Sequence, residues 1–175
     1  MRILTIAIVA LLTIGFAARA ARAKGAAMLK PGDTAPLFTL PAHNGDTVSL
    51  ASFKGEKFVV LVFYPGDQTP GCTKQLCELR DNYAMLQQAN AVVFGLNQAG
   101  GDSHGKFIDK YDLPFPLLVD EGSRVAALYR CKGKLMTERT VYVVDPQGTI
   151  VFARRGMPST AEIRESIGPA TPAAQ

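Results

Sequence analysis

The sequence predicts an α/β sandwich built around a mixed β-sheet. Apolar segments with the character of strands alternate with helix-like segments, a pattern typical of a sheet covered by helices. Strand-turn-strand patterns lie at both ends of this region and indicate β-hairpins. The length of 175 residues suits one domain. We therefore expect a domain over residues 24–168, a leader over 1–23 and a loose tail over 169–175.

The first 23 residues have the layout of a cleavable secretory signal. Arg2 precedes an apolar run over residues 3–16, and small-x-small cleavage options follow at residues 18–20 and 21–23. The alternative is a membrane anchor, but the apolar run falls short of the roughly 20 residues that cross a bilayer. We therefore expect export to the periplasm or the extracellular space, without stable membrane insertion after cleavage.

The basic charge of the chain belongs mostly to this leader. The formal net charge is +4, and loss of the three leader arginines lowers it to +1. The remaining basic residues, such as Arg154 with Arg155 and Lys132 with Lys134, are therefore interpreted as solvated surface. Composition does not favour a nucleic-acid partner.

The first half of the domain predicts a hairpin and then a buried strand. Residues 35–42 and 46–53 flank Asn44-Gly45, a dipeptide that suits the positive φ angles of a tight hairpin turn. Residues 58–64, FVVLVFY, are apolar at every position, as expected for a central strand that is covered on both faces.

The second half continues the alternation. Residues 91–96 and 115–120 predict two more buried strands, and each precedes a helical stretch, near 103–111 and near 123–130. Residues 140–155 predict a hairpin.

That hairpin turns at Asp145-Pro146-Gln147-Gly148, where proline at the second turn position is favourable. Ser159 and Glu162 form the capping box of a last helix over residues 160–167.

The helix after the central strand begins with a cysteine in its first turn. Thr69 is a good N-cap, Pro70 suits the first helical position, and Cys72 then follows. Free amides and the helix dipole favour an anion at this place. A cysteine there ionises more readily than a free thiol, so Cys72 is positioned as a nucleophile.

The second cysteine of this helix points in another direction. Cys72 shares a face with the predicted buried stripe, which consists of Leu76, Leu79, Tyr83 and Leu86. Cys77 lies about 140° around the axis, and the two Cα atoms would be roughly 8.6 Å apart in an intact helix. A disulfide needs less than about 7 Å. Either the pair reacts in sequence after the first turns unwind, or it is a permanent disulfide, which is ordinary in exported proteins.

The same residues resemble a known family. PGDQTPGC fits the P-x-x-x-T-x-x-C signature of peroxiredoxins, and TPGCTKQLCELRD is similar to the Q-type branch, also called bacterioferritin-comigratory protein. The likeness covers about residues 30–168 and includes VVFGLN, KFIDKYDLPFPLLVD and ERTVYVVDPQG. The resemblance implies a thioredoxin-like fold with an N-terminal β-hairpin and the reduction of hydroperoxides by thiols.

The resemblance also implies roles for five residues. Cys72 would be the peroxidatic cysteine and Cys77 the resolving one. Thr69 would donate its hydroxyl hydrogen bond to the peroxide, and Pro65 would shield the thiolate. Arg139, just before a predicted strand, would favour the thiolate and stabilise the charge that develops on the leaving oxygen.

The implied cycle passes from a Cys72 sulfenic acid to a Cys72–Cys77 disulfide, which a thioredoxin-like dithiol protein reduces. It requires no metal or other cofactor, and the branch is often monomeric. His43 and His104 lack any companion at ligand spacing, so both are predicted to lie on the surface.

Two departures from the family pattern leave questions open. Asn97 and a glycine-rich loop stand where many members have Ser-x-Asp, with no predictable effect. Cys131 is additional: it is a buried inert thiol, an alternative resolving partner for Cys72, or a site of intermolecular pairing.

Two other functions compete with peroxide reduction. One is an exported thiol–disulfide exchange protein, although such proteins normally use C-x-x-C, whereas four residues intervene here. The other is a binding module without enzymatic activity that keeps a structural disulfide.

Overall fold

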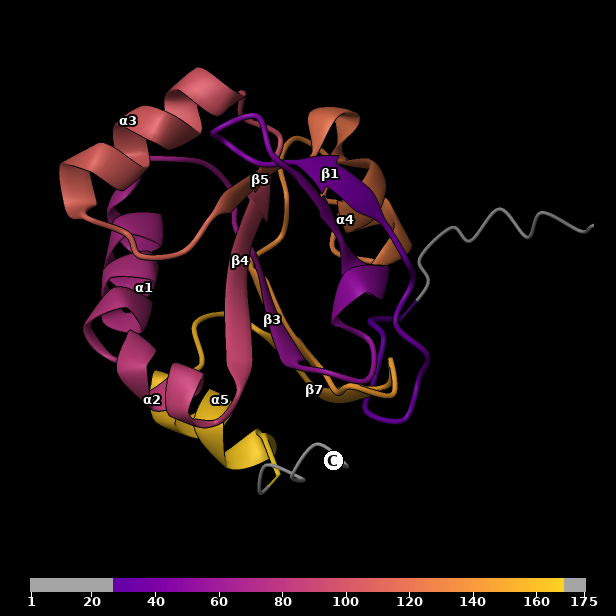
Figure 1. The fold of residues 1–175 in the computed structure, drawn as a ribbon. Coiled ribbons are helices and arrows are strands. Elements are labelled where there is room, and N and C mark those ends of the chain that lie inside the picture. Colours follow the sequence, from indigo (N-terminus) through magenta and orange to yellow (C-terminus); the bar gives the residue numbers. More distant parts are fainter. Residues whose placement is uncertain (1–26, 169–175) are drawn as a thin grey trace, which may run out of the picture.

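A five-stranded sheet forms the centre of the computed structural model, which describes residues 27–168 (Figure 1). The strand order across the sheet is β5-β4-β3-β6-β7. The strands are β3 (Phe58–Phe63), β4 (Ala91–Asn97), β5 (Leu117–Val119), β6 (Thr140–Val144) and β7 (Ile150–Arg155). The predicted leader and tail lie outside the described residues.

The sheet is mixed, as predicted. β3 runs parallel to β4 and antiparallel to β6, while β4 pairs with β5 in parallel and β6 with β7 antiparallel. The parallel pairs need helical crossovers, and the sequence supplies them between the strands. β3 is buried from Val59 onward, since helices or loops cover both of its faces.

Helices and a hairpin cover the two faces of the sheet (Figure 1). One face carries α1 (Pro70–Asp81), α2 (Tyr83–Gln88), α3 (Gly101–Tyr111) and α5 (Thr160–Ser166). The other face carries α4 (Arg124–Leu128) and the antiparallel hairpin of β1 (Thr39–Pro41) and β2 (Thr47–Ser49). Two short 3₁₀ helices, η1 (Leu50–Phe53) and η2 (Glu121–Ser123), complete the described elements.

The alternation of side chains along β3 divides the core in two. Val60 and Val62 pack with Cys72 and the helices of α1, α2, α3 and α5. Leu61 and Phe63 point to the opposite face and pack with the hairpin and α4. A side chain in one cluster is therefore separated from the other cluster by the sheet itself.

The turns and caps follow the sequence prediction. Gly45 and Gly148 have φ of 88° and 85°, which glycine adopts without strain, and both hairpins form. Ser159 and Glu162 make the predicted capping box at the start of α5.

The stripe that predicted one helix after β3 falls on two helices. The first ends at Asp81, and Asn82 (φ −113°, ψ 14°) separates it from α2. The Asn82 side chain donates to the carbonyl of Glu78 at 2.9 Å, which offers the backbone an alternative to helical hydrogen bonding. Leu79 and Leu86 are nevertheless buried in the same cluster.

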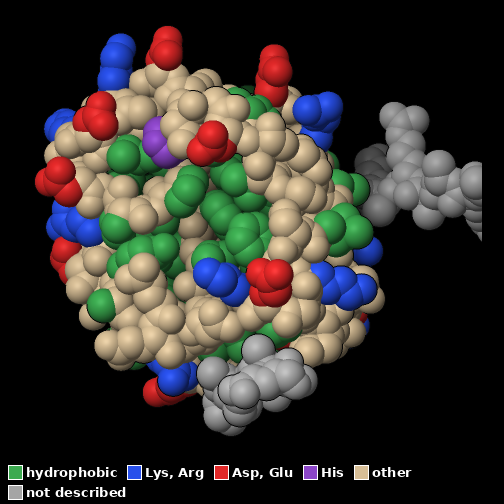
Figure 2. Space-filling view, viewed as in Figure 1, with side chains coloured by type: hydrophobic (Ala, Val, Ile, Leu, Met, Phe, Trp, Pro, Cys, Tyr) green, Lys and Arg blue, Asp and Glu red, His purple; other side chains and the backbone are tan. Residues whose placement is uncertain are grey.

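The charged side chains are spread over the surface. Figure 2 shows both signs around the visible face, with apolar side chains near its middle. Arg154 and Arg155 are exposed and form ion pairs with Glu162 and Glu138, as expected of solvated surface. Among the described helices, none combines the length and the apolar character that crossing a membrane would need.

Candidate active site

The first turn of α1 presents Cys72 as predicted. Thr69 is the N-cap with extended backbone (φ −76°, ψ 145°), and Pro70 is the first helical residue. The carbonyl of Thr69 accepts from the Thr73 amide at 2.9 Å, so the helix is regular from its start. The amides before Thr73 have no acceptor within the helix, and they surround Cys72 with partial positive charge.

Arg139 lies directly against the thiol. Its Nη2 is 3.1 Å from the Cys72 Sγ, and its Nη1 donates to the Gln75 Oε1 at 2.5 Å. Cys72 is fully buried and Gln75 is 2% exposed. Because the guanidinium is always charged, the sulfur of Cys72 lies beside a fixed positive charge.

Gly71 makes this close approach possible. A Cβ at Gly71 would lie 3.2 Å from the Arg139 Nη2, tighter than an ordinary carbon contact. The absence of a side chain there lets the guanidinium lie over the first turn of α1 and reach the sulfur.

Pro65 and Thr69 lie in the loop that joins β3 to α1. Pro65 is half-buried, and Thr69 is exposed. The Thr69 hydroxyl makes no capping bond to its own helix and instead donates to the Gly66 carbonyl at 3.4 Å, a long and weak hydrogen bond. Of the five residues named from the resemblance, Cys72 and Arg139 are in direct contact, whereas Pro65 and Thr69 lie in the loop before α1 and their roles toward Cys72 remain predictions.

Cys77 lies in the same helix and is partly exposed. Cys72, Cys77 and Cys131 are all free thiols. The helix continues without a break from Pro70 to Asp81, so both thiols of the pair belong to one intact helix. Formation of a bond between Cys72 and Cys77 remains a prediction that requires this helix to unwind.

Side-chain hydrogen bonds attach the second half of α1 to its neighbours, whereas Arg139 contacts its first half, where Cys72 and Leu76 pack into the core. The Glu78 carboxylate accepts from the Thr160 amide at 2.7 Å and from the Thr160 hydroxyl at 3.1 Å, at the start of α5. Arg80 donates to the carbonyl of Tyr111 at the end of α3, with a distance of 2.6 Å. These anchors begin one residue after Cys77.

Cys131 is buried on the opposite side of the sheet from Cys72. It belongs to the cluster formed with α4 and the hairpin, while Cys72 belongs to the cluster under α1. Burial raises the pKa of the Cys131 thiol far above its ordinary value. Its position supports the inert thiol among the three predicted roles, because the sheet separates it from Cys72.

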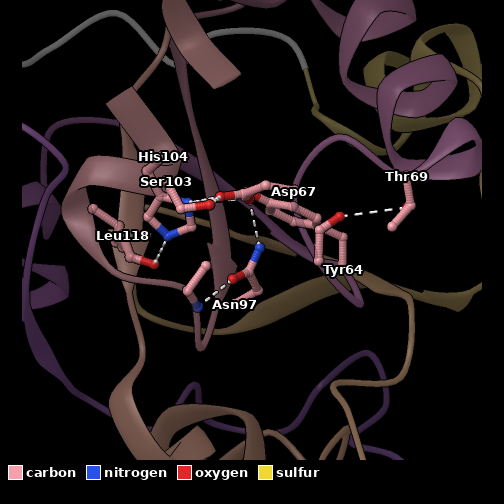
Figure 3. A network of polar contacts seen from close by, with 9 residues as sticks. Tyr64, Asp67, Thr69, Asn97, Ser103, His104 and Leu118 are labelled. Carbon is pink, nitrogen blue, oxygen red and sulfur yellow. Dashed lines mark hydrogen bonds and ion pairs between the residues drawn. The ribbon is translucent and has the colours of Figure 1, made fainter. Parts of the chain in front are cut away.

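A second cluster of polar groups lies beside the site, around Asp67 (Figure 3). Four side chains donate to its carboxylate, at distances between 2.6 and 2.9 Å: Tyr64, Asn97, Ser103 and His104. Asn97 also accepts from the Ala99 amide at 2.6 Å, so it ties the glycine-rich loop to this cluster. The loop whose effect was unpredictable therefore leads Ser103 and His104 to Asp67.

The prediction that His104 lies on the surface is wrong. Its side chain is 0% exposed, and Nδ1 lies 2.9 Å from the Asp67 Oδ2. Sequence reasoning sought a metal-ligand companion for this histidine, but its partner is a carboxylate 37 residues away. His43, which was also predicted at the surface, is half-buried.

These contacts change the titration of two groups. Burial alone would raise the pKa of Asp67, but the hydrogen bonds from His104, Ser103 and Asn97 and the charge of His104 outweigh it and lower the pKa to about 2. Burial, together with the nearby Asp67 charge, raises the pKa of Tyr64 well above its ordinary value. Asp67 is thus ionised and Tyr64 neutral at neutral pH.

Gln75 was not predicted as a site residue, although its spacing from Cys72 pointed to it. It stands three residues after Cys72, a spacing that places both side chains on the same face of a helix. A polar residue on a buried face needs a partner, and Arg139 provides it.

Within residues 27–168, no three histidine, cysteine or acidic side chains are grouped so that they could hold a metal ion. The chemistry that this arrangement offers is that of a buried sulfur nucleophile with a fixed cation beside it.

Comparison with known proteins places this arrangement in a family. Residues 31–153 match the AhpC/TSA family. The chain is 44% identical over 127 residues to the chloroplastic peroxiredoxin Q of Sedum lineare and 45% identical over 124 residues to that of Triticum aestivum. The matches cover 71% and 69% of this chain, and they span 68% and 57% of the length of these plant proteins.

A solved structure gives the same result for the fold. The crystal structure of peroxidoxin BcpB from Mycobacterium tuberculosis superimposes with a TM-score of 0.75 at 28% identity, over 82% of this chain and 99% of that one. The predicted fold is confirmed as thioredoxin-like. The relatives include chloroplastic and bacterial proteins. The chain belongs to the AhpC/TSA family and, within it, to the group of peroxiredoxin Q and bacterioferritin-comigratory proteins.

Proposed function

We propose that this protein is a thiol-dependent peroxidase that reduces hydrogen peroxide or organic hydroperoxides through Cys72. The observation that carries the proposal is the contact of 3.1 Å between the Cys72 Sγ and the Arg139 guanidinium, at the first turn of α1. A fixed cation and free helical amides at this place favour the nucleophile and also the negative charge that a breaking O–O bond releases.

The first step oxidises the sulfur by two electrons. The Cys72 thiolate attacks one oxygen of the peroxide, an S–O bond forms as the O–O bond breaks, and the leaving oxygen takes a proton to become water or an alcohol. Cys72 is left as a sulfenic acid. Arg139 stabilises the leaving oxygen in the transition state, the Thr69 hydroxyl donates to the peroxide, and Pro65 limits the access of water to the sulfur.

The second step forms an intrachain disulfide. The Cys77 thiol attacks the sulfur of the sulfenic acid, the S–S bond forms, and the hydroxyl leaves as water. Because the two cysteines share an intact helix, the first turns of α1 must unwind beforehand. A thioredoxin-like dithiol then donates two electrons by thiol–disulfide exchange and restores both thiols.

Two finer features, the oligomeric state and the location of the protein, also belong to the proposal. The enzyme acts as a monomer, as is common in this branch, and light scattering at assay concentration tests this. It is exported on the leader of residues 1–23, which lies outside the described residues. Mass spectrometry of the protein from its native host tests export, and a chain that retains Met1 or Arg2 contradicts it.

Two measurements test the peroxidase proposal. Purified protein should consume hydroperoxide with a dithiol and a thioredoxin, and it should not reduce insulin disulfides. Substitution of Cys72 by serine should abolish consumption. Reduction of insulin without peroxide consumption would instead favour the thiol–disulfide exchange alternative.

Mass spectrometry after one equivalent of peroxide tests the pairing. A loss of two hydrogens and a peptide that links Cys72 to Cys77 are expected. If the Cys77→Ser variant still formed an intrachain disulfide, the resolving role assigned to Cys77 would be wrong.

A further inference from the structure

We propose that the buried pair of Asp67 and His104 positions the loop of residues 65–69, which leads directly into the helix of Cys72, and thereby sets the rate at which Cys72 reacts with a hydroperoxide. The inference rests on the peroxidase function proposed above and extends it to two residues that do not touch the sulfur. Both are positioning residues, because they act through Pro65 and Thr69.

Asp67 belongs to this loop, but its side chain turns into the protein (Figure 3). It is 5% exposed, although its neighbours Gln68 and Thr69 are exposed. A carboxylate in such a place is costly unless its charge is matched and its oxygens are bonded. The donors come from the end of β3, from β4 and from the first turn of α3, so Asp67 joins the loop to three elements of the fold.

His104 attaches this carboxylate to the sheet. Its Nδ1 lies 2.9 Å from the Asp67 Oδ2, and its Nε2 lies 3.2 Å from the carbonyl oxygen of Leu118 in β5. Both ring nitrogens therefore face an oxygen acceptor, one on the loop and one on the sheet. The pair fixes the loop to a strand on the same sheet that carries Arg139 at the start of β6.

The conformation of this loop requires contacts with residues outside the loop. Gln68 has φ of 55°, a left-handed conformation that costs a residue with a side chain about 1 kcal/mol or more. The hydrogen bond of Thr69 within the loop, to Gly66, is long at 3.4 Å. Local contacts are thus too weak to keep Gln68 strained and Thr69 in place, whereas the bonds of Asp67 are short and involve a charge.

The position of the loop matters for peroxide and not for every reagent. Thr69 is the N-cap residue of α1, and in the proposed function its hydroxyl leaves its weak bond to the Gly66 carbonyl and donates to the substrate. A displacement of about 1 Å in such a group can cost up to about 100-fold in rate. An alkylating agent such as iodoacetamide needs the Cys72 thiolate but makes no use of a donor to a peroxide oxygen. The ratio of the two rate constants therefore reports on positioning separately from the reactivity of the thiol.

The experiment compares Asp67→Asn with Asp120→Asn. The Asp120 side chain is also buried, and it accepts from the amides of Val125 and Ala126 at 2.9 and 2.8 Å, but these amides belong to α4, on the other side of the sheet. Each variant loses a carboxylate that is buried and accepts hydrogen bonds. Rate constants for hydrogen peroxide and for iodoacetamide are measured on Cys72, well below the unfolding temperature of each variant.

We expect the peroxide-to-iodoacetamide ratio to fall about 10- to 100-fold in Asp67→Asn and to change less than about 3-fold in Asp120→Asn. An unchanged ratio in Asp67→Asn, or an equal fall in both variants, overturns the inference. If Asp67→Asn does not fold, Ser103→Ala replaces it, because this variant removes the hydrogen bond of 2.6 Å from Ser103 to Asp67. The same ratio of rate constants is measured, and a smaller fall is expected. If the unmodified protein does not consume peroxide at all, the proposed function fails instead.

Discussion

Replacement of Arg139 by glutamine should slow the reaction of Cys72 with hydrogen peroxide by about 10- to 150-fold. The guanidinium donates one bond to the sulfur at 3.1 Å and one to Gln75 at 2.5 Å. At 3.1 Å, two unit charges interact by about 5 kcal/mol when the effective dielectric constant is about 20. Arg139 is only half-buried, so solvent screening reduces this value.

A hydrogen bond to a charged group contributes about 1.5–3 kcal/mol, which suits a half-buried pair better than the full Coulomb value. Because every 1.4 kcal/mol changes a rate tenfold, this range corresponds to the expected 10- to 150-fold loss.

The assay is rapid-quench mass spectrometry of Cys72 after mixing with peroxide. Arg155→Gln is the matched control, since Arg155 is an exposed arginine that pairs with Glu138 rather than with the sulfur. Arg139→Lys should fall between the two, because one ammonium cannot reproduce the planar fork that reaches Cys72 and Gln75 together. A rate within 3-fold of the unmodified protein in Arg139→Gln would refute the reasoning.

Three further predictions concern other parts of the molecule. Because the pKa of Asp67 falls from 3.8 to about 2 on folding, this group adds about 2 kcal/mol of stability above pH 4 that is lost as the pH falls toward 2. In urea unfolding, the difference in the free energy of unfolding between the unmodified protein and Asp67→Asn should therefore narrow from pH 5 to pH 2. A constant difference would contradict this. Glu78→Gln weakens the contact of α1 with Thr160, so the Cys72–Cys77 disulfide should form faster after oxidation, as measured by quenched mass spectrometry. The control is Glu165→Gln, an exposed change on α5, and slower disulfide formation in Glu78→Gln would contradict the prediction. Cys131→Ala should keep peroxide turnover within about 2-fold, since the sheet separates Cys131 from Cys72, and a large loss would reveal a catalytic role.

Local patterns in the sequence predicted most of the strands, turns and helices of the fold. The apolar run of β3, the Asn44-Gly45 turn and the capping box of Ser159 each describe an interaction between residues close in the chain. The strand and the capping box formed as predicted, and the hairpin formed with a positive φ at Gly45 but not at Asn44. The break at Asn82 was missed because its side chain competes with the helix backbone, while the apolar stripe continues across it.

Site residues could be predicted where they depend on neighbours in the sequence or on the family signature. Cys72 follows from Thr69 and Pro70, which mark the start of a helix. Asp67 and His104 pair across 37 residues, and no spacing rule brings a loop aspartate to a helical histidine that distant in the chain. Such a contact depends on how α3 packs against β5, at the edge of the assembled sheet.

The anchoring of α1 at Glu78 has a consequence for repeated turnover. If melting stops after Cys77, only residues 70–77 leave the helix, and of its buried apolar side chains only Cys72 and Leu76 lose their surroundings. Exposure of one leucine costs about 2 kcal/mol, and the contacts of Arg139 with Cys72 and Gln75 are lost as well, against a stability of about 5–15 kcal/mol for a whole domain. Leu79 and Leu86 stay buried, so each oxidation unfolds only the first turns of α1. The rest of the domain keeps its fold, and residues 70–77 can refold against it after reduction.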